Sequence, residues 1–362
     1  MDKQFKDPIY GYIKIPVDYV TDIIDKAEFQ RLRRVVQTSY SPLYSSAIHN
    51  RFVHSIGVFY LGSIVAEILT GEIIKKRILD SKEVKNLADI YKLACLLHDV
   101  GHAPFSHTGE CFYMDEAFRS IQLHTRIAEL VGDETFKADI IDRESKSAPP
   151  HELMSVIVGL NNFGSFFNTS TDKEFFARCI TGYHYKGDSK TNQIKNCFIS
   201  MLNSKVIDVD RLDYLIRDAY ITGYETVNID YQRLLSAITV VEYEGYYQVA
   251  YKKNALSVIE NVVYAHDAEK KWIQNHPAVL YDTYLLKRMI MRLNKLLNDN
   301  EKGNRIFSVE ALSKEGVVLN NGVKVSFFTE KVRDIPSDIV INDTYIEKLE
   351  EELVKTKDSD CV

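Results

Sequence analysis

The chain of 362 residues carries a net charge of −6 and is 45% hydrophobic, which provides enough apolar material for one large domain or two moderate ones. Proteins that coat nucleic acid usually show a basic field, so this acidic chain is not expected to be one of them. The five cysteines form no CxxC pair and imply no disulfide framework. No signal-peptide segment opens the chain and no apolar run approaches the ~18 residues of a membrane span, so we expect a soluble, cytoplasmic protein without a membrane partner.

The spacing of apolar residues predicts a series of helices connected by loops. The helix expected over 85–98 ends in a very apolar run. The next helix, from Ala103 to about Phe118, has Pro104 in its first turn, where a missing N–H costs little. The other helices are expected over residues 17–35, 51–78, 119–132, 151–160, 172–181, 190–204, 210–220, 255–298 with a break at Pro277, and 344–356.

Strand signals are confined to two hairpins. One is expected where 238–242 and 246–251 flank a Glu-Gly pair, and the other where 317–319 and 323–328 flank Asn-Asn-Gly, a strong turn signal. We therefore predict a mainly α fold, with a helical core and small β-hairpin appendages in the C-terminal third.

His98 and Asp99 are the most informative pair of residues in the chain. Three of only ten histidines fall within ten positions here, at His98, His102 and His107, directly after the apolar helix end. Adjacent imidazole and carboxylate groups can both bind a transition metal, and the later histidines can move protons beside it. The sequence therefore indicates metal chemistry at this helix end.

Two residues elsewhere complete a candidate metal set. His54 lies three residues after Arg51, so both share one face of a predicted helix, and Asp210 opens another helix. Alone, His54 could be a hydrogen-bonded or surface residue and Asp210 a helix N-cap. Together with the first pair they give two imidazoles and two carboxylates, a mixed N/O set that suits Fe, Mn, Zn or Co.

With these motifs in this order, the sequence resembles the HD-domain metal-dependent phosphohydrolases, and more narrowly their deoxynucleoside triphosphate triphosphohydrolase (dNTPase) branch. The matching segments are Asp7–Ile13, Phe29–Arg33, His49–Gly57, Leu97–His107, His151–Ser155 and Asp208–Asp218. We expect an HD phosphohydrolase core over 1–235. We expect the region over 236–362 to complete the pocket and to offer an oligomer interface, since members of the family often assemble.

The resemblance implies that His54, His98, Asp99 and Asp210 bind one divalent transition metal, with Fe, Mn, Zn, Co and Ni as candidates and Mg²⁺ as a further candidate on the nucleotide phosphates. It implies catalytic roles around the scissile phosphate for His102, His107 and His151. It assigns substrate contacts to Gln37, Arg51, Arg211, Tyr214 and Asp218. In this scheme the two arginines hold phosphates, while the glutamine and the tyrosine lie at the sugar. From the residues alone, His102 could instead brace the next helix and His151 could start one.

The reaction implied by the resemblance is metal-assisted attack on the α-phosphorus of a deoxynucleoside triphosphate (dNTP), which releases a deoxynucleoside and inorganic triphosphate. A triphosphate carries about four negative charges, which a metal and arginines must offset. One alternative keeps the phosphohydrolase and changes its substrate to a monophosphate, a signalling nucleotide or a single-stranded nucleic acid end. The other is a non-catalytic nucleotide-sensing module whose metal site is only a structural brace.

The sequence departs from the dNTPase branch in the last long predicted helix. The relatives carry an arginine and a base-stacking tyrosine there, where this chain aligns His266 and Gln274. Trp272 could supply a replacement stacking face or be plain core or interface. Asp25 and Arg33 match positions of an allosteric nucleotide site in some relatives, or form an ordinary helix salt bridge, which we prefer. The sequence leaves the base preference open.

Overall fold

The computed structural model describes residues 2–39, 41–113, 121–142, 148–299, 317–318 and 324–325. The prediction of a mainly α fold is confirmed. The longer helices are α3 (Arg51–Lys75), α4 (Ser81–Leu97), α5 (Ile121–Val131), α6 (Glu134–Asp142), α7 (Pro150–Asn162), α8 (Ser170–Thr181), α9 (Lys190–Leu202), α10 (Val209–Thr222), α11 (Tyr231–Ser236), α12 (Leu256–Glu269) and α13 (Pro277–Asp299). Of these, α6 and α11 were not predicted, and the charged helix predicted over 344–356 lies outside the described residues.

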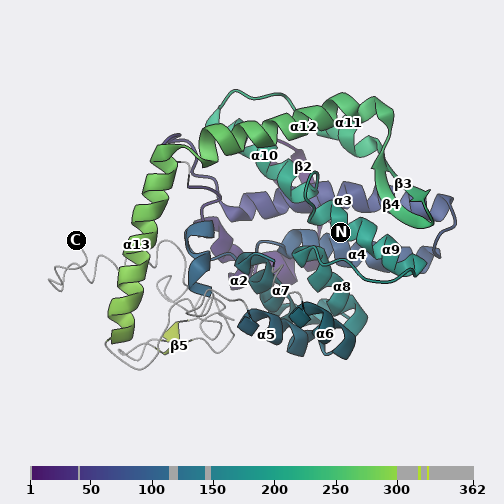
Figure 1. Ribbon diagram of the computed structural model, residues 1–362, viewed down its shortest axis with the longest axis horizontal. Helices are drawn as coiled ribbons and strands as arrows, with labels where there is room; N and C mark the ends of the chain where they lie inside the picture. Colours follow the sequence, from purple (N-terminus) through teal and green to yellow (C-terminus); the bar gives the residue numbers. More distant parts are fainter. Residues whose placement is uncertain are drawn as a thin grey trace.

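The hydrophobic core is built around α3 and α4, which pack against each other in the middle of the molecule (Figure 1). Their apolar faces supply side chains that are at most 1% exposed, among them Val58, Leu61, Val65, Leu93 and Leu97. By length and composition α3 could cross a membrane, but 67% of its most apolar window is buried inside the protein. The apolar character of α3 is therefore explained by its central place in the core.

The remaining helices surround this pair. α10 packs against α3, α8 packs against α4, and α5 and α6 lie together at one end beside α7 (Figure 1). After α12 the chain makes one π-helical turn, η8 (Lys270–Gln274), and α13 then starts at Pro277, where the predicted break is confirmed. α13 stands at the side of the bundle and contacts the short turn η3 (Ser106–Thr108), which brings a late segment of the chain to the histidine-rich region.

The structure contains one hairpin that was not predicted, at the N-terminus. β1 (Asp2–Asp7) pairs antiparallel with β2 (Gly11–Pro16), and its turn is closed by the Asp7 carboxylate, which accepts the backbone N–H groups of Ile9 and Tyr10. This hairpin adds to the ones predicted toward the C-terminal third. The two predicted hairpins are present as the pairs β3 (Ile238–Tyr243) with β4 (Tyr246–Tyr251) and β5 (Val317–Val318) with β6 (Lys324–Val325).

Two predicted helices are replaced by irregular backbone. Residues 17–35 form α1 (Val17–Tyr19), a π turn η1 (Val20–Ile24), α2 (Ala27–Gln30) and a 3₁₀ turn η2 (Arg31–Arg34). The predicted helix is wrong from Ala103 to Tyr113, where the described residues end, because Phe105 and Ser106 have φ values of +59° and +53° and the two turns η3 and η4 (Glu110–Tyr113) follow. Left-handed backbone at two consecutive non-glycine residues is costly and is typical of functional loops.

Candidate active site

Three of the four predicted metal ligands meet at one point. His54 comes from the first turns of α3, His98 caps the C-terminus of α4, and Asp210 lies in the first turn of α10. The Nε2 atoms of the two histidines are 3.2 Å apart, and the Asp210 Oδ1 atom lies 3.0 Å from the first and 3.6 Å from the second. Ligands bound about 2.0–2.2 Å from one ion are separated by such distances.

The fourth predicted ligand, Asp99, lies next to the two histidines and also binds Arg51. Its Oδ2 atom is 3.5 Å from His54 Nε2 and its Oδ1 atom is 3.5 Å from His98 Nε2. The Arg51 guanidinium donates to Oδ2 at 2.7 Å. Burial alone would raise the pKa of Asp99, but Arg51 and the neighbouring histidines hold it well below its ordinary value. The carboxylate is therefore charged at neutral pH and available to a cation.

The two histidines are oriented for metal binding by their other ring nitrogens. His54 Nδ1 lies 2.8 Å from an oxygen of Asp213, and His98 Nδ1 lies 2.9 Å from the backbone oxygen of Cys95. Because both partners can only accept, each Nδ1 carries a proton, and each Nε2 is left facing Asp210. Burial opposes the imidazolium of His54, but Asp210 and Asp213 outweigh it and raise the pKa of His54 to about 10, so a metal ion would take the place of the proton on Nε2. This orientation, with the mixed N/O donor set, fits a divalent transition metal.

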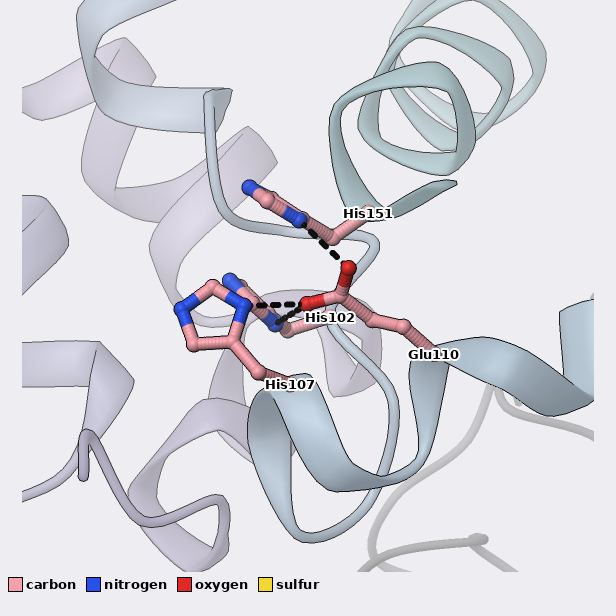
Figure 2. A group of neighbouring side chains, drawn as sticks. All are labelled: His102, His107, Glu110 and His151. Atoms are coloured by element: carbon pink, nitrogen blue, oxygen red, sulfur yellow. Dashed lines mark hydrogen bonds and ion pairs between the residues drawn. The ribbon is translucent and has the colours of Figure 1, made fainter. Parts of the chain in front are cut away.

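A second group of side chains lies next to this site and surrounds one carboxylate (Figure 2). Glu110 Oε1 is 2.5 Å from His107 Nδ1 and 3.6 Å from His102 Nδ1, and Glu110 Oε2 is 3.0 Å from His151 Nδ1. His102 also lies 3.2 Å from Asp99 Oδ1, so it links the two groups. The three histidines predicted to be catalytic are thus brought together around an acid that was not predicted.

The charges within this histidine cluster differ from one member to the next. Burial opposes the imidazolium of His151, but the Glu110 carboxylate outweighs burial and raises its pKa to about 9. Burial would raise the pKa of Glu110, yet His151 and His107 hold it well below its ordinary value. For His102, burial and then Arg51 lower the pKa well below the usual range. At neutral pH the cluster therefore holds a proton on His151 beside an ionised Glu110.

By donor type alone, this cluster could also hold a metal ion. However, the rings of His102 and His151 are stacked, with centroids 4.2 Å apart and planes only 12° apart. Two stacked, nearly parallel imidazoles cannot both aim an in-plane lone pair at one ion midway between them. The arrangement favours holding and moving protons over binding a metal.

A cavity of about 500 Å³ opens onto both groups. Asp99 and Asp210 border it from the metal ligands, and His107 and His151 border it from the histidine cluster. Its far wall comes from η8 and α13. The residues of that wall are Gln274, Val279, Leu280, Thr283 and Lys287. A substrate in this cavity would touch metal ligands, proton-carrying histidines and the late helix α13 together.

His54, His98 and Asp99 lie in a segment of the chain that matches the model of a known protein family. Residues 51–162 match the family model of the HD domain. The chain therefore contains an HD domain over these residues. The matched segment runs from α3 to the end of α7 and contains the first three candidate metal ligands and the whole histidine cluster. Asp210 lies beyond it, on α10.

Curated proteins similar to this HD-domain chain cover most of its length. The uncharacterized protein MJ1154 of Methanocaldococcus jannaschii is 29% identical over 75% of this chain and 46% of its own length. The uncharacterized protein YwfO of Bacillus subtilis is 28% identical over 82% of this chain and 57% of its own length. The deoxynucleoside triphosphate triphosphohydrolase SAMHD1 homolog of Dictyostelium discoideum is 31% identical over 66% of this chain and 40% of its own length. The chain thus spans about half the length of these relatives.

The predicted substrate contacts fall into two sets. Gln37, Arg51, Tyr214 and Asp218 line the cavity beside the HD-domain histidines. Arg211 does not line it. Its Nη1 donates to the backbone oxygen of Val206 at 2.8 Å and its Nε to the hydroxyl of Tyr214 at 3.3 Å. Arg211 is therefore separated from the cavity by Tyr214, and its side chain would have to change rotamer to contact a phosphate there.

The residues aligned with the base pocket of the relatives are also divided. Gln274 lines the cavity, whereas His266 and Trp272 do not. Trp272 is 62% exposed, so its interpretation as plain core is wrong. Arg33 donates to Gln30 at 2.9 Å and lies over the ring of Phe52. Arg33 therefore contacts its own helical segment and Phe52 of α3, and no ion pair between Arg33 and Asp25 is recorded among the described residues.

Sequence reasoning missed Glu110 and Asp213, the two carboxylates that organise the histidines. A signal existed for each: Glu110 lies three residues after His107, and Asp213 lies three residues after Asp210 on one helix. His49 was also missed. Its Nε2 lies 2.6 Å from Asp218, so it holds a carboxylate that lines the cavity.

Proposed function

We propose that this HD-domain protein is a metal-dependent phosphohydrolase that cleaves dNTPs to deoxynucleoside and inorganic triphosphate. One observation carries the proposal: a single cavity is bordered by Asp99 and Asp210 of the candidate metal-ligand set and by two histidines of a cluster that holds a proton. The similarity to deoxynucleoside triphosphate triphosphohydrolases supports the choice of substrate. Perturbed titratable groups converging on one cavity are typical of enzymes rather than binding modules.

His54, His98, Asp99 and Asp210 would hold the metal, which would supply positive charge at the phosphates and acidify water there. Arg51 fixes one of these ligands: its guanidinium binds Asp99, the hydroxyl of Ser106 and the backbone oxygen of Gln37. The left-handed backbone at Ser106 places that hydroxyl under the arginine. The arginine is thereby positioned at the cavity wall with little freedom left to lose on substrate binding.

The leaving deoxynucleoside needs a proton on its 5′ oxygen. The cluster formed by His107, Glu110 and His151 can provide it, because both histidines border the cavity and the carboxylate between them holds the proton on His151. Glu110 is ionised and touches both imidazoles, so after each turnover it can relay to His151 a proton that enters from water at His107, whose side chain is 67% exposed. Gln37 lines the same cavity, and no partner is recorded for its Oε1 atom among the described residues, so a sugar hydroxyl could bind it.

A product-resolved assay tests this function. The protein loaded with Mn²⁺, Fe²⁺, Zn²⁺, Co²⁺ or Ni²⁺ is incubated with each dNTP, and the products are separated. Deoxynucleoside plus triphosphate is the expected outcome, and monophosphate plus pyrophosphate would contradict attack that releases the nucleoside. Asp99→Ala should abolish turnover, whereas Asp172→Asn, a buried carboxylate that caps α8, should not.

A second candidate substrate is another nucleotide. It is favoured by the far wall of the cavity, where Gln274 stands at the position aligned with the base-stacking tyrosine of the relatives and the nearby Trp272 points away into solvent. Release of phosphate from a panel of monophosphates and signalling nucleotides, with no product from any dNTP, would favour this candidate over the first.

A further inference from the structure

The metal ligand His54 is attached to a fully buried carboxylate. Asp213 is 0% exposed, and its Oδ2 atom accepts the Nδ1–H of His54 at 2.8 Å. The opposite oxygen, Oδ1, accepts the hydroxyl of Tyr10 at 2.8 Å. Tyr10 belongs to the turn of the N-terminal hairpin, more than forty residues before His54 in the chain. A metal ligand is therefore linked to the hairpin through one carboxylate.

Arg217 makes a second link between Asp213 and the N-terminal hairpin. Arg217, 1% exposed, donates from Nε and Nη2 to the two oxygens of Asp213, each at 2.9 Å. Its Nη1 donates at 3.0 Å to Oδ2 of Asp7, while the other Asp7 oxygen closes the hairpin turn. A buried arginine shared by two carboxylates is compensated in charge and fixed in geometry.

The neighbouring helix leaves room for this network through a glycine. Gly57 lies one turn after His54 on α3, and a Cβ atom there would be 2.0 Å from Asp213 Oδ1 and 2.4 Å from Arg217 Nη2. A side chain at this position would displace the carboxylate that contacts His54. The close approach of α3 and α10 is thus built around the Asp213–Arg217 pair.

We propose that Asp213 is the positioning residue for the metal ligand His54, and that the N-terminal hairpin, through Asp7, Tyr10 and Arg217, sets how tightly the site holds its divalent metal. The carboxylate keeps the proton on Nδ1 and the Nε2 lone pair directed at the metal. The other ligand, His98, is held only by a neutral backbone oxygen. The network therefore acts on one of the two imidazoles, and it does so whichever nucleotide is the substrate.

Conservative variants separate this role from folding. Tyr10→Phe removes one hydrogen bond to Asp213 and keeps the ring, which packs against Tyr60 and Tyr231. Its matched control is Tyr19→Phe, since the Tyr19 hydroxyl reaches only a backbone oxygen on α4. Asp7→Asn keeps the oxygen that closes the turn and removes the charge facing Arg217.

The control for Asp7→Asn is Asp172→Asn. Asp172 is also buried, and one of its oxygens likewise accepts two backbone N–H groups, but it lies at the start of α8 away from the metal ligands. A third variant, Asp213→Asn, removes the acceptor charge directly. The melting temperature of each metal-free protein shows whether the variant is folded before its metal binding is measured.

The measurement is the dissociation constant for Mn²⁺ and Zn²⁺, obtained by competition with a chelator, together with the visible spectrum of the Co²⁺-loaded protein. Asp213→Asn is expected to weaken metal binding by about 10- to 100-fold, and Asp7→Asn and Tyr10→Phe by about tenfold or less. The Co²⁺ spectrum should change in all three variants and in neither control. Affinity and spectrum do not depend on turnover, so they stay informative if no dNTP is hydrolysed.

Two results would overturn the proposal. One is wild-type metal affinity in folded Tyr10→Phe and Asp7→Asn proteins. The other is an equal loss in the Tyr19→Phe and Asp172→Asn controls, which would show that the effect is general destabilisation. If Asp213→Asn does not fold, the two hairpin variants decide the question alone.

Discussion

His151 and Glu110 form a largely buried pair in which the histidine Nδ1 and the carboxylate Oε2 are 3.0 Å apart. The pair joins the first residues of α7 to the turn η4, and its histidine borders the cavity that the candidate metal ligands Asp99 and Asp210 also border. Since Glu110 keeps His151 protonated at neutral pH, the pair is a store for one proton next to the place where a phosphate ester would be cleaved.

This pair predicts the pH dependence of catalysis. His151 is protonated below its pKa of about 9, so kcat/KM should fall as the pH rises through about 9. In Glu110→Gln burial still lowers the pKa of His151 and the largest raising influence is gone, so the falling limb should move from about 9 toward the ordinary value of 6.5. Initial rates between pH 5 and 10, measured at fixed metal saturation, test this. An unmoved limb in the folded Glu110→Gln protein would rule out the pair as the proton store.

The same pair also makes stability depend on pH. The folded pKa of His151 lies above its unfolded value of 6.5, so its contribution is fully present below pH 6.5 and is lost as the pH rises through about 9. Glu110 behaves in the opposite sense, because its pKa is lowered, and its contribution is lost in acid. Urea unfolding of the wild type and of His151→Gln at pH 6 and pH 9.5 should show a smaller difference between them at the higher pH.

Gly57 and Gly71 give a matched test of the packing behind His54. Both lie in α3, but a Cβ atom at Gly57 would overlap Asp213 and Arg217, whereas at Gly71 it would meet nothing within 4 Å. Gly57→Ala should therefore lower the free energy of unfolding by about 1–3 kcal/mol or more. Gly71→Ala should raise it by about 0.5–1 kcal/mol, because alanine suits a helix better. Chemical denaturation of the two variants measures both, and equal effects would contradict the geometry at Gly57.

Gln37 predicts how the sugar is recognised. Replacing it by leucine should leave stability almost unchanged, because its Oε1 atom has no recorded partner among the described residues. If that atom receives a sugar hydroxyl, the wild type should prefer a dNTP over the 2′,3′-dideoxy analogue by about tenfold or more, and Gln37→Leu should lose most of the preference. The control is Gln232→Leu, an exposed glutamine on α11. Retention of the full preference in Gln37→Leu would remove Gln37 from the sugar site.

The sequence predicts the helical core and the candidate metal ligands for a shared reason: both follow from patterns along the chain, the spacing of apolar residues for the helices and the joint placement of scarce histidines and carboxylates for the ligands. Histidines are scarce, and His54 and His98 stand at helix positions that can be read from apolar spacing. Asp213 and Glu110 could not be ranked in this way, since an aspartate or glutamate on a helix is usually solvated. Their importance comes from tertiary contacts, and only the fold shows that Asp213 is fully buried.

Local conformation limited the other predictions. β1 and β2 form a single two-stranded hairpin whose outer face is charged, so its alternation lacks the apolar strength of a core strand. The backbone at Phe105 and Ser106 is left-handed although neither residue is a glycine, so the sequence carries no signal for it. The composition of this stretch predicts a helix instead. In both places a tertiary contact stabilises the local conformation. Arg217 binds Asp7 in the hairpin turn, and Arg51 binds the Ser106 hydroxyl.

The charges around the cavity lead to a prediction for Lys287. The cavity is lined by five acidic side chains and three that carry positive charge: Asp99, Glu152, Asp210, Asp218 and Glu269, with Arg51, Lys287 and the protonated His151. Burial raises the pKa of Glu152 to about 8, which keeps that group neutral, but the lining is still acidic. Arg51 is engaged by Asp99. Among the described residues, Lys287 on α13 has no recorded ion-pair partner, so it is the side chain free to meet a phosphate.

Lys287→Met should therefore raise KM for a dNTP and weaken inhibition by inorganic triphosphate by about tenfold, with a smaller effect on inhibition by inorganic phosphate, because the attraction grows with ligand charge. Lys287→Arg should restore most of the binding. The neighbouring Arg288→Met serves as the control, since Arg288 contacts Tyr284 and does not line the cavity. Inhibition constants at low and at physiological salt measure the effect, which should shrink as salt screens the charge. Equal constants for the two methionine variants would show that α13 closes the cavity without binding the phosphates.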